Sequence, residues 1–291
     1  MKKKKEFVKP LRLSFSQLMT YVRCPEHYLF RYIFGIRTPS GKAMKQGSAL
    51  HDAIAEGYMR KMEEGRAPSI PQAQEMYRKL LRKHLEDYYE ELERGSFLIT
   101  KEFLAKERKV SSSDLLDAGT RGIAVYKKEI ERRTDPLFAE EPFEIPLRNN
   151  IELVGRIDLV DTSHILHETK TTKKKPVLQQ TSLDPQLAFY QFAYEYLTSQ
   201  KPKSMVKDFL ILGKKDAFVV RYPVRKSEIG KNSLFRIIDA ISFAVRNNVW
   251  YCVHTADSWV CSQGWCGYFK LHRELRKVGL ERMKQKYMNK K

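Results

Sequence analysis

The chain has 291 residues, enough to bury a sizeable core in one large domain or in a core with a helical appendage. It contains 54 Lys and Arg against 35 Asp and Glu, a formal net charge of +19, which favours a polyanionic partner over an acidic protein. No apolar run approaches the roughly 18 residues of a membrane span, and no signal-type segment follows the lysine-rich start, so we expect a cytoplasmic protein without membrane contacts.

The first third of the chain is expected to be helical. Ser14 is a cap for two short helices within residues 14–34, which Pro25 separates, and the aromatic residues of this stretch are expected to lie in the core. Residues 35–42 have glycines at the wrong spacing for a phosphate-binding loop, so we expect an ordinary loop there. Residues 44–62 have a helical pattern that includes His51.

Two further amphipathic helices are expected at residues 71–92 and 113–132. Both carry mixed charge. Together they predict a helical insertion between the first helices and the sheet, in a position to clamp a substrate strand.

A β-hairpin is expected within residues 151–172. The segments 151–160 and 165–171 have the alternation of strands, and the residues between them form the turn. If that turn has three residues, Asp161 faces Ile165, and the pairing of all earlier positions follows from this one. A two-residue turn would shift the register by one.

The three-residue turn would bring three charged groups together. Asp158 would lie opposite Glu168 on the same face, with Cβ atoms about 5 Å apart. Lys170 stands two positions beyond Glu168, so the strand period of two places it on that face as well. The hairpin therefore predicts two carboxylates and an ammonium group at one point.

Two carboxylates this close are unfavourable unless a cation or a proton lies between them. Carboxylate oxygens suit a hard divalent ion, Mg²⁺ or Mn²⁺, that keeps several waters. Such an ion lowers the pKa of a bound water and neutralises charge at a phosphoryl group, while Lys170 would orient the water or help deprotonate it. The alternative is a cross-strand salt-bridge patch of Asp158, Glu168 and Lys170 on a solvated face.

The segments after the hairpin complete an α/β pattern. Residues 173–176 form a basic loop that suits phosphates, although a solvated loop is the simpler interpretation. A helix from Asp184 through Leu197 places Gln186 and Tyr190 one turn apart on one face. Two strands and a long helix are then expected at residues 206–212, 217–224 and 227–248. This order favours a mixed central sheet flanked by helices.

Four short motifs occur in a fixed order between residues 13 and 272. They are Gly47 to His51 (G-x-x-x-H), Gly155 to Asp158 (G-x-x-D), Glu168 to Thr171 (E-x-K-T) and Gln186 to Tyr190 (Q-x-x-x-Y). This set resembles the RecB-type branch of the PD-(D/E)XK nucleases. The resemblance implies the restriction-endonuclease-like core of that superfamily, and hydrolysis of phosphodiester bonds in DNA with Mg²⁺ or Mn²⁺.

The resemblance also implies roles for individual residues. The expected metal ligands are the side chains of His51, Asp158 and Glu168 and the carbonyl of Thr169. Lys170 would activate the attacking water. Gln186 and Tyr190 would position the scissile strand.

The cysteines suggest a second metal site. Four cysteines in a chain this size favour thiols or metal ligands over a disulfide framework. In iron–sulfur members of the resembled branch, one cysteine near the start joins three near the end. The set that corresponds here is Cys24, Cys261, Cys266 and His272, although the spacing of Cys261 departs from the pattern and Cys252 is an alternative to the histidine.

This set would hold a [4Fe–4S] cluster or a tetrahedral Zn²⁺, and would then staple the two chain ends together. The alternative is a group of buried thiols without a metal. A bound metal would add folding free energy and would take no part in cleavage.

We therefore expect one nuclease domain over residues 11–282. Its parts are a helical insertion at about 65–135, a catalytic core at about 140–225 and a cysteine-containing segment at 250–275, with basic tails at 1–10 and 283–291. The expected function is a metal-dependent DNA nuclease, preferably an exonuclease on single strands or duplex ends. Recombination, repair, phage DNA processing and CRISPR-type adaptation are the processes that fit, with a helicase, recombinase or integrase as partner. The alternative is a nuclease-derived DNA-binding or structural subunit, silent or active only within a larger complex.

Overall fold

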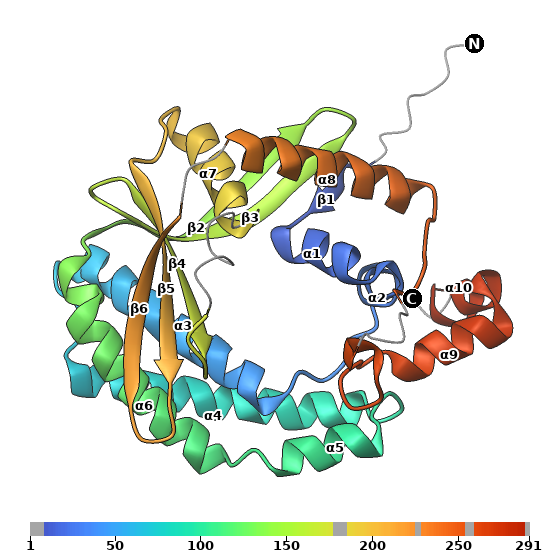
Figure 1. The fold of residues 1–291 in the computed structure, drawn as a ribbon, viewed down its shortest axis with the longest axis horizontal. Coiled ribbons are helices and arrows are strands. Elements are labelled where there is room, and N and C mark those ends of the chain that lie inside the picture. Colours follow the sequence, from blue (N-terminus) through green and yellow to red (C-terminus); the bar gives the residue numbers. More distant parts are fainter. Residues whose placement is uncertain (1–8, 177–184, 225–227, 254–258, 289–291) are drawn as a thin grey trace.

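The computed structural model describes residues 9–176, 185–224, 228–253 and 259–288. Within these residues, six strands form a mixed sheet flanked by helices, so the expected α/β architecture is confirmed (Figure 1). The first half contains β1 (Leu11–Leu13), α1 (Phe15–Arg23), α2 (Pro25–Tyr28), the π-helical turn η1 (Leu29–Ile33), α3 (Lys42–Glu64), α4 (Ile70–Arg94), α5 (Lys101–Arg108), α6 (Ser112–Glu129) and η2 (Glu131–Arg133). The second half contains β2 (Pro136–Leu147), β3 (Ile151–Asp161), β4 (Ile165–Thr172), α7 (Pro185–Thr198), β5 (Ser204–Leu212), β6 (Ala217–Val224), α8 (Glu228–Arg246), η4 (Trp259–Cys261), α9 (Phe269–Val278) and α10 (Leu280–Met288).

The two short helices expected near the start are present. Ser14 caps α1 through a reciprocal pair of bonds, in which the Gln17 backbone donates to the Ser14 hydroxyl and the Ser14 backbone donates to the Gln17 amide oxygen. Pro25 is the first residue of α2, where its missing N–H costs nothing. Tyr28 and Phe30 are almost fully buried, which confirms that these aromatic residues belong to the core.

The sheet is built around β3. β2 pairs antiparallel with β3 along almost its whole length, β1 pairs parallel with residues 151–153, and β4 pairs antiparallel with the last residues of β3. β5 then adds parallel to β4, and β6 antiparallel to β5. The sequence pattern missed β1, which has three residues, and β2, which contains several prolines. Prolines fit in β2 because it is an edge strand of the described sheet, where a missing N–H breaks no ladder bond.

The β3–β4 hairpin has the expected register. Leu159 pairs with His167 and Val160 with Leu166, so the turn has three residues and Asp158 falls opposite Glu168. The turn is held by Asp161, whose carboxylate accepts hydrogen bonds from the backbone of residues 163 and 165 at 2.9 Å each. The sequence expectation on which the site depended is therefore confirmed.

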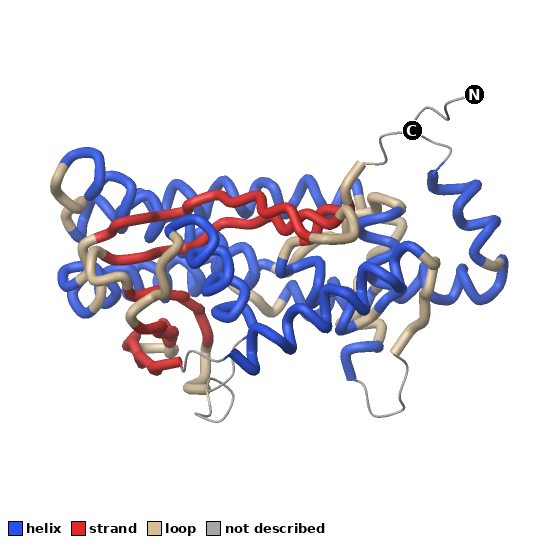
Figure 2. Tube along the Cα trace, turned by 90° about the horizontal axis from the view of Figure 1, so that it is seen from above, coloured by secondary structure: helices blue, strands red, loops and turns tan. Residues whose placement is uncertain are grey.

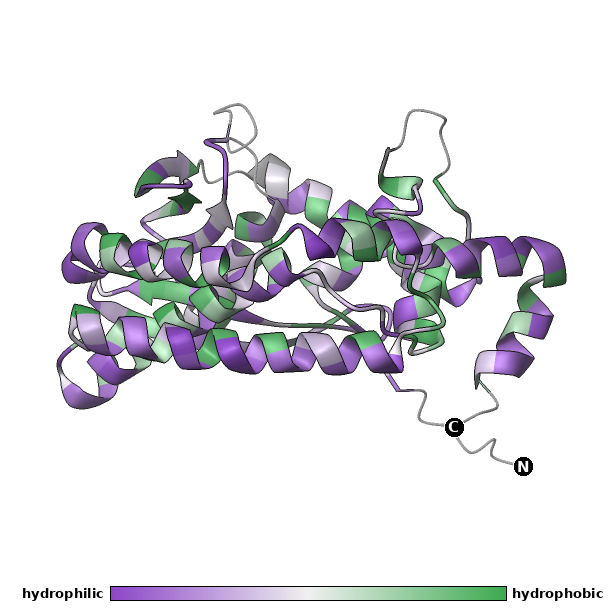
Figure 3. Ribbon diagram, turned by 90° about the horizontal axis from the view of Figure 1, so that it is seen from below, coloured by the Kyte–Doolittle hydropathy of each residue, from purple (hydrophilic) through white to green (hydrophobic). Residues whose placement is uncertain are grey.

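Helices cover both faces of the sheet. α3, α4 and α6 pack on one face, while α7 and α8 pack on the other, and each layer has its own hydrophobic cluster. Figure 2 shows the longer strands running beside the helices, and Figure 3 shows hydrophilic and hydrophobic residues alternating along the surrounding helices. Helices therefore cover much of both faces, and the carboxylates of Glu168 on β4 and Asp208 on β5 are fully buried.

The region expected as a helical insertion contains α4, α5 and α6. α4 and α6 correspond to the two expected helices, and α5 was not predicted. α4 buries one face, with Tyr77, Leu81 and Tyr88 inward, against α3 and α6. The insertion is therefore packed on the domain along most of its length.

The C-terminal helices return to the N-terminal ones. Tyr268, Leu271 and Met283 are almost fully buried, in one cluster with Leu29 and Phe30 of the first turns. The expected basic tail at 283–291 is therefore wrong for residues 283–288, which belong to α10, because Met283 gains apolar contacts in this cluster. Residues 289–291, most of the N-terminal tail, and the expected helix starts at Asp184 and Ser227 lie outside the described residues.

None of the helices in the described part combines the length and the apolar composition that crossing a membrane requires.

We expect Gly119→Ala to lower the free energy of unfolding by about 1–3 kcal/mol, as overpacking does in a dense interface. A Cβ on Gly119 of α6 would lie 2.0 Å from the Tyr77 hydroxyl of α4, and this tyrosine is held by a 2.8 Å bond to the Leu115 carbonyl. Urea unfolding would measure the effect. Gly47→Ala is the matched control, because its Cβ meets nothing within 4 Å and alanine favours a helix by up to about 1 kcal/mol. Equal effects of the two substitutions would contradict this packing.

Candidate active site

The candidate site lies where β3 and β4 separate. β2 occupies one edge of β3, so β1 and β4 share the other edge, at residues 151–153 and 159–160 respectively. The recorded pairing with β4 ends at Leu159, and Asp158 and Glu168 are the next positions on the two strands. Their side chains therefore stand at a fork in the sheet, close together but not closed in by further strand pairing.

Asp158 is held from both sides of the sheet. The Tyr190 hydroxyl of α7 donates to Asp158 Oδ1 at 2.9 Å, and the Gln186 amide donates to the Tyr190 hydroxyl at 3.0 Å. From the opposite layer, Nε2 of His51 on α3 lies 3.3 Å from Asp158 Oδ2. The structure thus joins residues from three of the four sequence motifs in one chain of contacts.

Glu168 is the most deeply buried of the acids, with a side chain that is 0% exposed. The Lys170 ammonium lies 2.5 Å from Glu168 Oε1, but neither carboxylate oxygen has a well-formed hydrogen bond within the described residues. Burial and the charge of Asp158 raise the pKa of Glu168 to about 8, and the nearby Lys170 only partly offsets them. Placing a negative charge on this group is therefore unfavourable without a further cation.

His51 carries positive charge in this arrangement. Hydrogen bonding to Asp158 and Asp52 raises the pKa of His51 to about 10. In turn, burial opposes ionisation of Asp158, but the hydrogen bond and charge of His51 keep its pKa below the ordinary value. Asp52 also lies 2.8 Å from Nε2 of His84 on α4, so the helical insertion contacts the residue next to the site.

Glu140 on β2 is a site residue that the sequence reasoning missed. Its Oε1 lies 3.7 Å from His51 Nε2, and ligand atoms of His51, Glu140 and Asp158 all lie within 4.8 Å of one another. The sequence offered a signal for this residue, because Glu140 precedes the hairpin by about the length of one strand. We did not use this signal, because β2, the strand that carries Glu140, was not predicted.

Tyrosines close the site on the α3 and α6 side. A small pocket there is lined by Tyr58, Tyr126 and Thr169 together with the charged residues. The Tyr126 and Thr169 hydroxyls are 3.3 Å apart. The Thr169 side chain is thus placed beside the acids, while a role for its carbonyl as a metal ligand stays a prediction.

A buried charged network supports the hairpin. Arg221 of β6 donates twice to Asp208 of β5, at 2.7 Å each, and His167 of β4 lies 3.1 Å from the Asp161 carboxylate of β3. Asp208 is fully buried, yet the Arg221 and His167 contacts hold its pKa below the ordinary value against the effect of burial. These contacts join four adjacent strands beside the acidic fork and restrain its geometry.

The donor set fits a hard divalent cation. Glu168 offers two buried carboxylate oxygens without hydrogen bonds in the described chain, and Glu140 offers a third. Asp158 and His51 add a carboxylate and an imidazole nitrogen within 4.8 Å of Glu140, in a triad that does not include Glu168. A bound cation would satisfy these oxygens and remove the repulsion between the carboxylates.

The cysteines gather at the junction of the chain ends. Ligand atoms of Cys24, Cys252 and His272 lie within 4.8 Å of one another. Burial, together with the nearby Cys24 and Cys261, raises the pKa of Cys252 to about 12, and the same influences raise the pKa of Cys266 to about 11. The structure therefore places Cys252 in the group beside the residues expected there.

His272 in this group is oriented by a buried carboxylate. Its Nδ1 lies 2.5 Å from Glu26 Oε2, and both side chains are at least nine-tenths buried. An imidazole held in this way by a carboxylate is the arrangement found beside metal ions. The close group thus contains two thiols and one imidazole, with Cys261 and Cys266 nearby, and both alternatives for the fourth ligand stay open.

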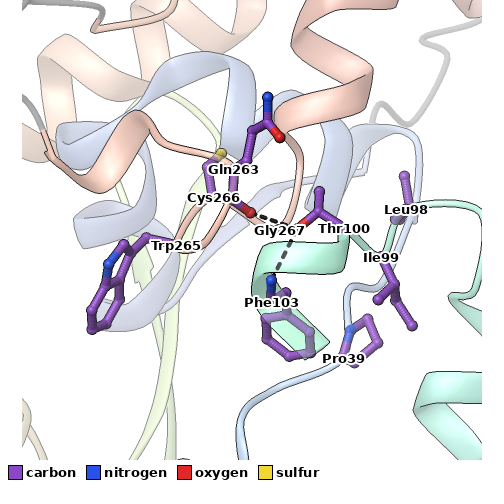
Figure 4. A pocket seen from close by; sticks show the side chains of 9 residues that line it. All are labelled: Pro39, Leu98, Ile99, Thr100, Phe103, Gln263, Trp265, Cys266 and Gly267. Atoms are coloured by element: carbon purple, nitrogen blue, oxygen red, sulfur yellow. Dashed lines mark hydrogen bonds between the residues drawn. The ribbon is translucent and has the colours of Figure 1, made fainter. Parts of the chain in front are cut away.

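The cysteine segment rests on the helical insertion. Figure 4 shows the loop around Cys266 and Gly267 against the first turn of α5, where the Thr100 hydroxyl donates to the Gln263 carbonyl at 2.7 Å. The Lys106 ammonium of α5 lies over the Trp265 ring, 3.3 Å from its centroid. This segment therefore connects both chain ends to the insertion.

Comparisons with known proteins identify the family of the chain. The family model of the PD-(D/E)XK nuclease superfamily matches residues 12–268. The gene 69 protein of Mycobacterium phage L5 is 41% identical over 69 residues, which are 24% of this chain and 23% of that protein. The match therefore spans less than a quarter of the curated relative. The crystal structure of a predicted exonuclease from Eubacterium rectale superposes with a TM-score of 0.49 at 11% identity, covering 84% of this chain and 86% of that one.

We expect Glu168→Gln to raise the melting temperature of the metal-free protein at pH 8. The folded protein keeps the Glu168 proton up to about pH 8, whereas the ordinary pKa is 4.5, so wild-type stability falls as pH rises between these values. Glutamine cannot ionise, so the Glu168→Gln variant does not lose this stability as pH rises. The difference in melting temperature should grow from pH 5 to pH 8 and then level off, at several degrees, since about 1 kcal/mol corresponds to roughly 2–4 °C.

Glu141→Gln, which removes a half-buried carboxylate next to Glu140 on the same strand, is the control. Scanning calorimetry in EDTA from pH 5 to pH 9 would measure both variants. A pH-independent difference for Glu168→Gln would show that the buried acid is ionised without penalty.

Proposed function

The chain belongs to the PD-(D/E)XK nuclease superfamily, and we propose that it is a metal-dependent deoxyribonuclease of the RecB type. It would hydrolyse phosphodiester bonds in DNA. The observation that supports this most directly is the buried carboxyl group of Glu168, without a well-formed hydrogen bond within the described residues and beside Asp158. A group that exists only to stabilise the fold has no reason to be kept in this state.

His51, Asp158 and Glu168, with the Thr169 carbonyl, would hold Mg²⁺ or Mn²⁺. The ion, when bound, supplies a water of lowered pKa and neutralises charge on the scissile phosphate. The side chains of the protein hold and orient the reacting groups. Tyr190, itself held by Gln186, keeps the Asp158 carboxylate oriented, and the Glu168 charge would hold Lys170 at the side of the site.

Lys170 would orient the attacking water and, as the neutral amine, take up its proton. Its side chain is 44% exposed, so it can reach a substrate from its place 2.5 Å from Glu168 Oε1. The water oxygen would form a bond to phosphorus, and the bond from phosphorus to the leaving sugar oxygen would break. Gln186 and Tyr190, on the adjacent face of α7, would also position the scissile strand.

Basic residues next to the hairpin would bind the DNA backbone. A groove beside α6 is lined by Arg121, Lys173 and Lys214, along with Asp114 and Asp117. Lys173 directly follows β4, and the Pro176 carbonyl accepts a 3.3 Å bond from the Tyr222 hydroxyl, which anchors the basic loop. With a net charge of +19, this groove suits phosphates within reach of the site.

We propose action at DNA ends, on single strands or duplexes, as the mode of cleavage. The RecB-type motifs favour it, and recombination, repair, phage DNA processing or CRISPR-type adaptation are the processes that such an enzyme serves. A helicase, recombinase or integrase would be the corresponding partner. We propose the cytoplasm as its location, because its substrate is there.

We propose a structural metal group at the cysteines. Four thiols, from Cys24, Cys252, Cys261 and Cys266, are the donor set of a [4Fe–4S] cluster, whereas replacing one of them by His272 gives the Cys3His set of Zn²⁺. Burial raises the pKa of the Cys252 and Cys266 thiols, so a metal that binds there would have to displace their protons. This group would hold α2, the C-terminal segment and the insertion together.

We expect Asp158→Asn to reduce cleavage by at least about 1000-fold, the scale of losing a group that stabilises transition-state charge. Tyr190→Phe should reduce it by only about 10–100-fold, because the hydroxyl acts through Asp158. End-labelled single- and double-stranded DNA, with Mn²⁺, Mg²⁺ or EDTA, would serve as substrates. Blocking the ends would separate exonuclease from endonuclease action.

The control is Asp135→Asn, whose side chain is 73% exposed and distant in register from the fork; it should cleave like the wild type. Cleavage in EDTA, or undiminished cleavage by Asp158→Asn, would reject the proposed site. If folded, metal-loaded wild type cleaves nothing, the chain is instead a silent or partner-dependent module.

We expect anaerobically purified protein to absorb at about 400 nm, as iron–sulfur clusters do, and to contain iron. Cys266→Ala should abolish the absorbance and lower the melting temperature, because the chain ends lose their connection. Cys252→Ala and His272→Ala would identify the fourth ligand. A colourless protein with one Zn²⁺ per chain supports the zinc alternative, and a metal-free protein of unchanged stability contradicts both.

A further inference from the structure

We infer that the sheet face beside the active site carries an aromatic platform on which unpaired bases of the DNA substrate stack. The aromatic platform consists of Phe209 on β5 and Phe218 on β6, and Tyr222 of β6 supports it. The inference rests on the proposed function, because it assigns the form of DNA that reaches Lys170. It concerns binding, which can be measured without any DNA cleavage.

The strand registers place both rings on the face that carries Lys170. Lys170 pairs with Phe209 across β4 and β5, and Phe209 pairs with Val220 across β5 and β6. Neighbouring strands lie about 4.8 Å apart, so Phe209 is the first side chain beside Lys170 on that face. Phe218 stands two positions before Val220 and therefore lies on the same face, one strand further away. A DNA strand with a phosphate at Lys170 would bring its neighbouring bases to these two rings.

The rings are accessible, although other parts of the same strands are covered. Leu210 of β5 lies on the opposite face, in the hydrophobic cluster with α3 and α6. Met205 and Val224 share the face of the rings but lie toward the other end of it, where they are buried in the cluster with α7. By contrast, Phe218 is 39% exposed and Phe209 is partly exposed. Two large apolar rings thus remain open to a ligand beside the site.

Phe209 is held in a defined orientation by its neighbour on β6. Its ring meets the Tyr222 ring edge to face, with centroids 5.8 Å apart. Tyr222 is itself almost buried, and its hydroxyl donates to the Pro176 carbonyl at 3.3 Å. A ring restrained in this way loses little conformational freedom when a base stacks on it, so the entropic cost of binding is small.

Positive charge accompanies the rings, which favours a nucleic acid strand as the occupant. The Lys207 ammonium lies 5.7 Å from the Phe209 ring centroid. Residues 173–175 are exposed lysines in the loop that the Tyr222 hydroxyl anchors beside this face. Aromatic rings that stack on bases and basic residues that follow the phosphates are the two components of a single-strand binding surface. A duplex would not use such rings, because its bases already stack on one another.

The experiment measures, by fluorescence anisotropy, how tightly the full chain binds two labelled oligomers. One is an oligothymidylate of about 12 nucleotides, within the range of single-strand sites, and the other has the same length but lacks every base. Ca²⁺ replaces Mg²⁺, and a gel confirms that the DNA stays intact. Both oligomers carry the same phosphates, so the difference in affinity reports contacts with bases. We expect a preference for the oligothymidylate of at least about 25-fold, since each of two stacked bases contributes about 5-fold or more.

Substitutions of the rings test which residues provide this preference. Phe209→Leu and Phe218→Leu should each reduce it by at least about 5-fold, because leucine is apolar but has no π-face. Phe209→Tyr retains the ring and should retain the preference. Phe243→Leu is the matched control, because Phe243 is 67% exposed but lies on α8, outside the sheet. The exposed Phe218 decides the matter even if Phe209→Leu fails to fold.

The outcomes separate this inference from the proposed function. Equal affinity of the wild type for the two oligomers, or a preference that survives both leucine variants, overturns the aromatic platform. Tighter binding of a duplex than of the single strand also overturns it. If Mn²⁺-dependent cleavage is present in any of these cases, the nuclease proposal stands alone. A preference for bases in a chain that cleaves no DNA supports the aromatic platform and rejects the nuclease.

Discussion

The approach of Asp158 and Glu168 across the β3–β4 fork is the constraint on which the rest of the structure depends. Two carboxylates in a nearly dry environment repel each other, and burial penalises each charge separately. The two carboxyl groups respond differently. Contacts with His51 keep Asp158 ionised, whereas Glu168 retains its proton to about pH 8. The fold must hold the two carboxylates rigidly to maintain this arrangement. A cation bound beside them would lower the free energy of the folded protein.

The rigidity comes from layers on both sides of the sheet. α7 supplies the Tyr190 hydroxyl from one face, and α3 supplies His51 from the other, so Asp158 is fixed between two helices. Beneath the fork, the Asp208–Arg221 and Asp161–His167 contacts join four strands. The two acids therefore provide the reactive groups, and the neighbouring residues hold these groups in position.

The cysteine group acts at a distance from this centre. It lies where α2, the C-terminal segment and the insertion meet, and the insertion in turn touches the site through His84 and Asp52. A metal there would stabilise the frame around the substrate without taking part in the reaction. This arrangement brings residues from both ends of the 291-residue chain together beside the insertion.

Local sequence patterns were enough to predict the hairpin, its three-residue turn and the helix of Gln186 and Tyr190, because strand alternation and helical spacing are local properties. From these followed the pairing of Asp158 with Glu168 and the α/β architecture. Only the tertiary structure revealed β2 and its Glu140, the burial of Met283 in α10 and the position of Cys252 beside Cys24. The edge strand β2 was not predicted because it contains prolines, and the helix α10 was not predicted because its sequence is highly charged. The reason is physical: whether an acid, a thiol or a basic helix is buried depends on partners that lie far away in the chain, and local patterns do not record them.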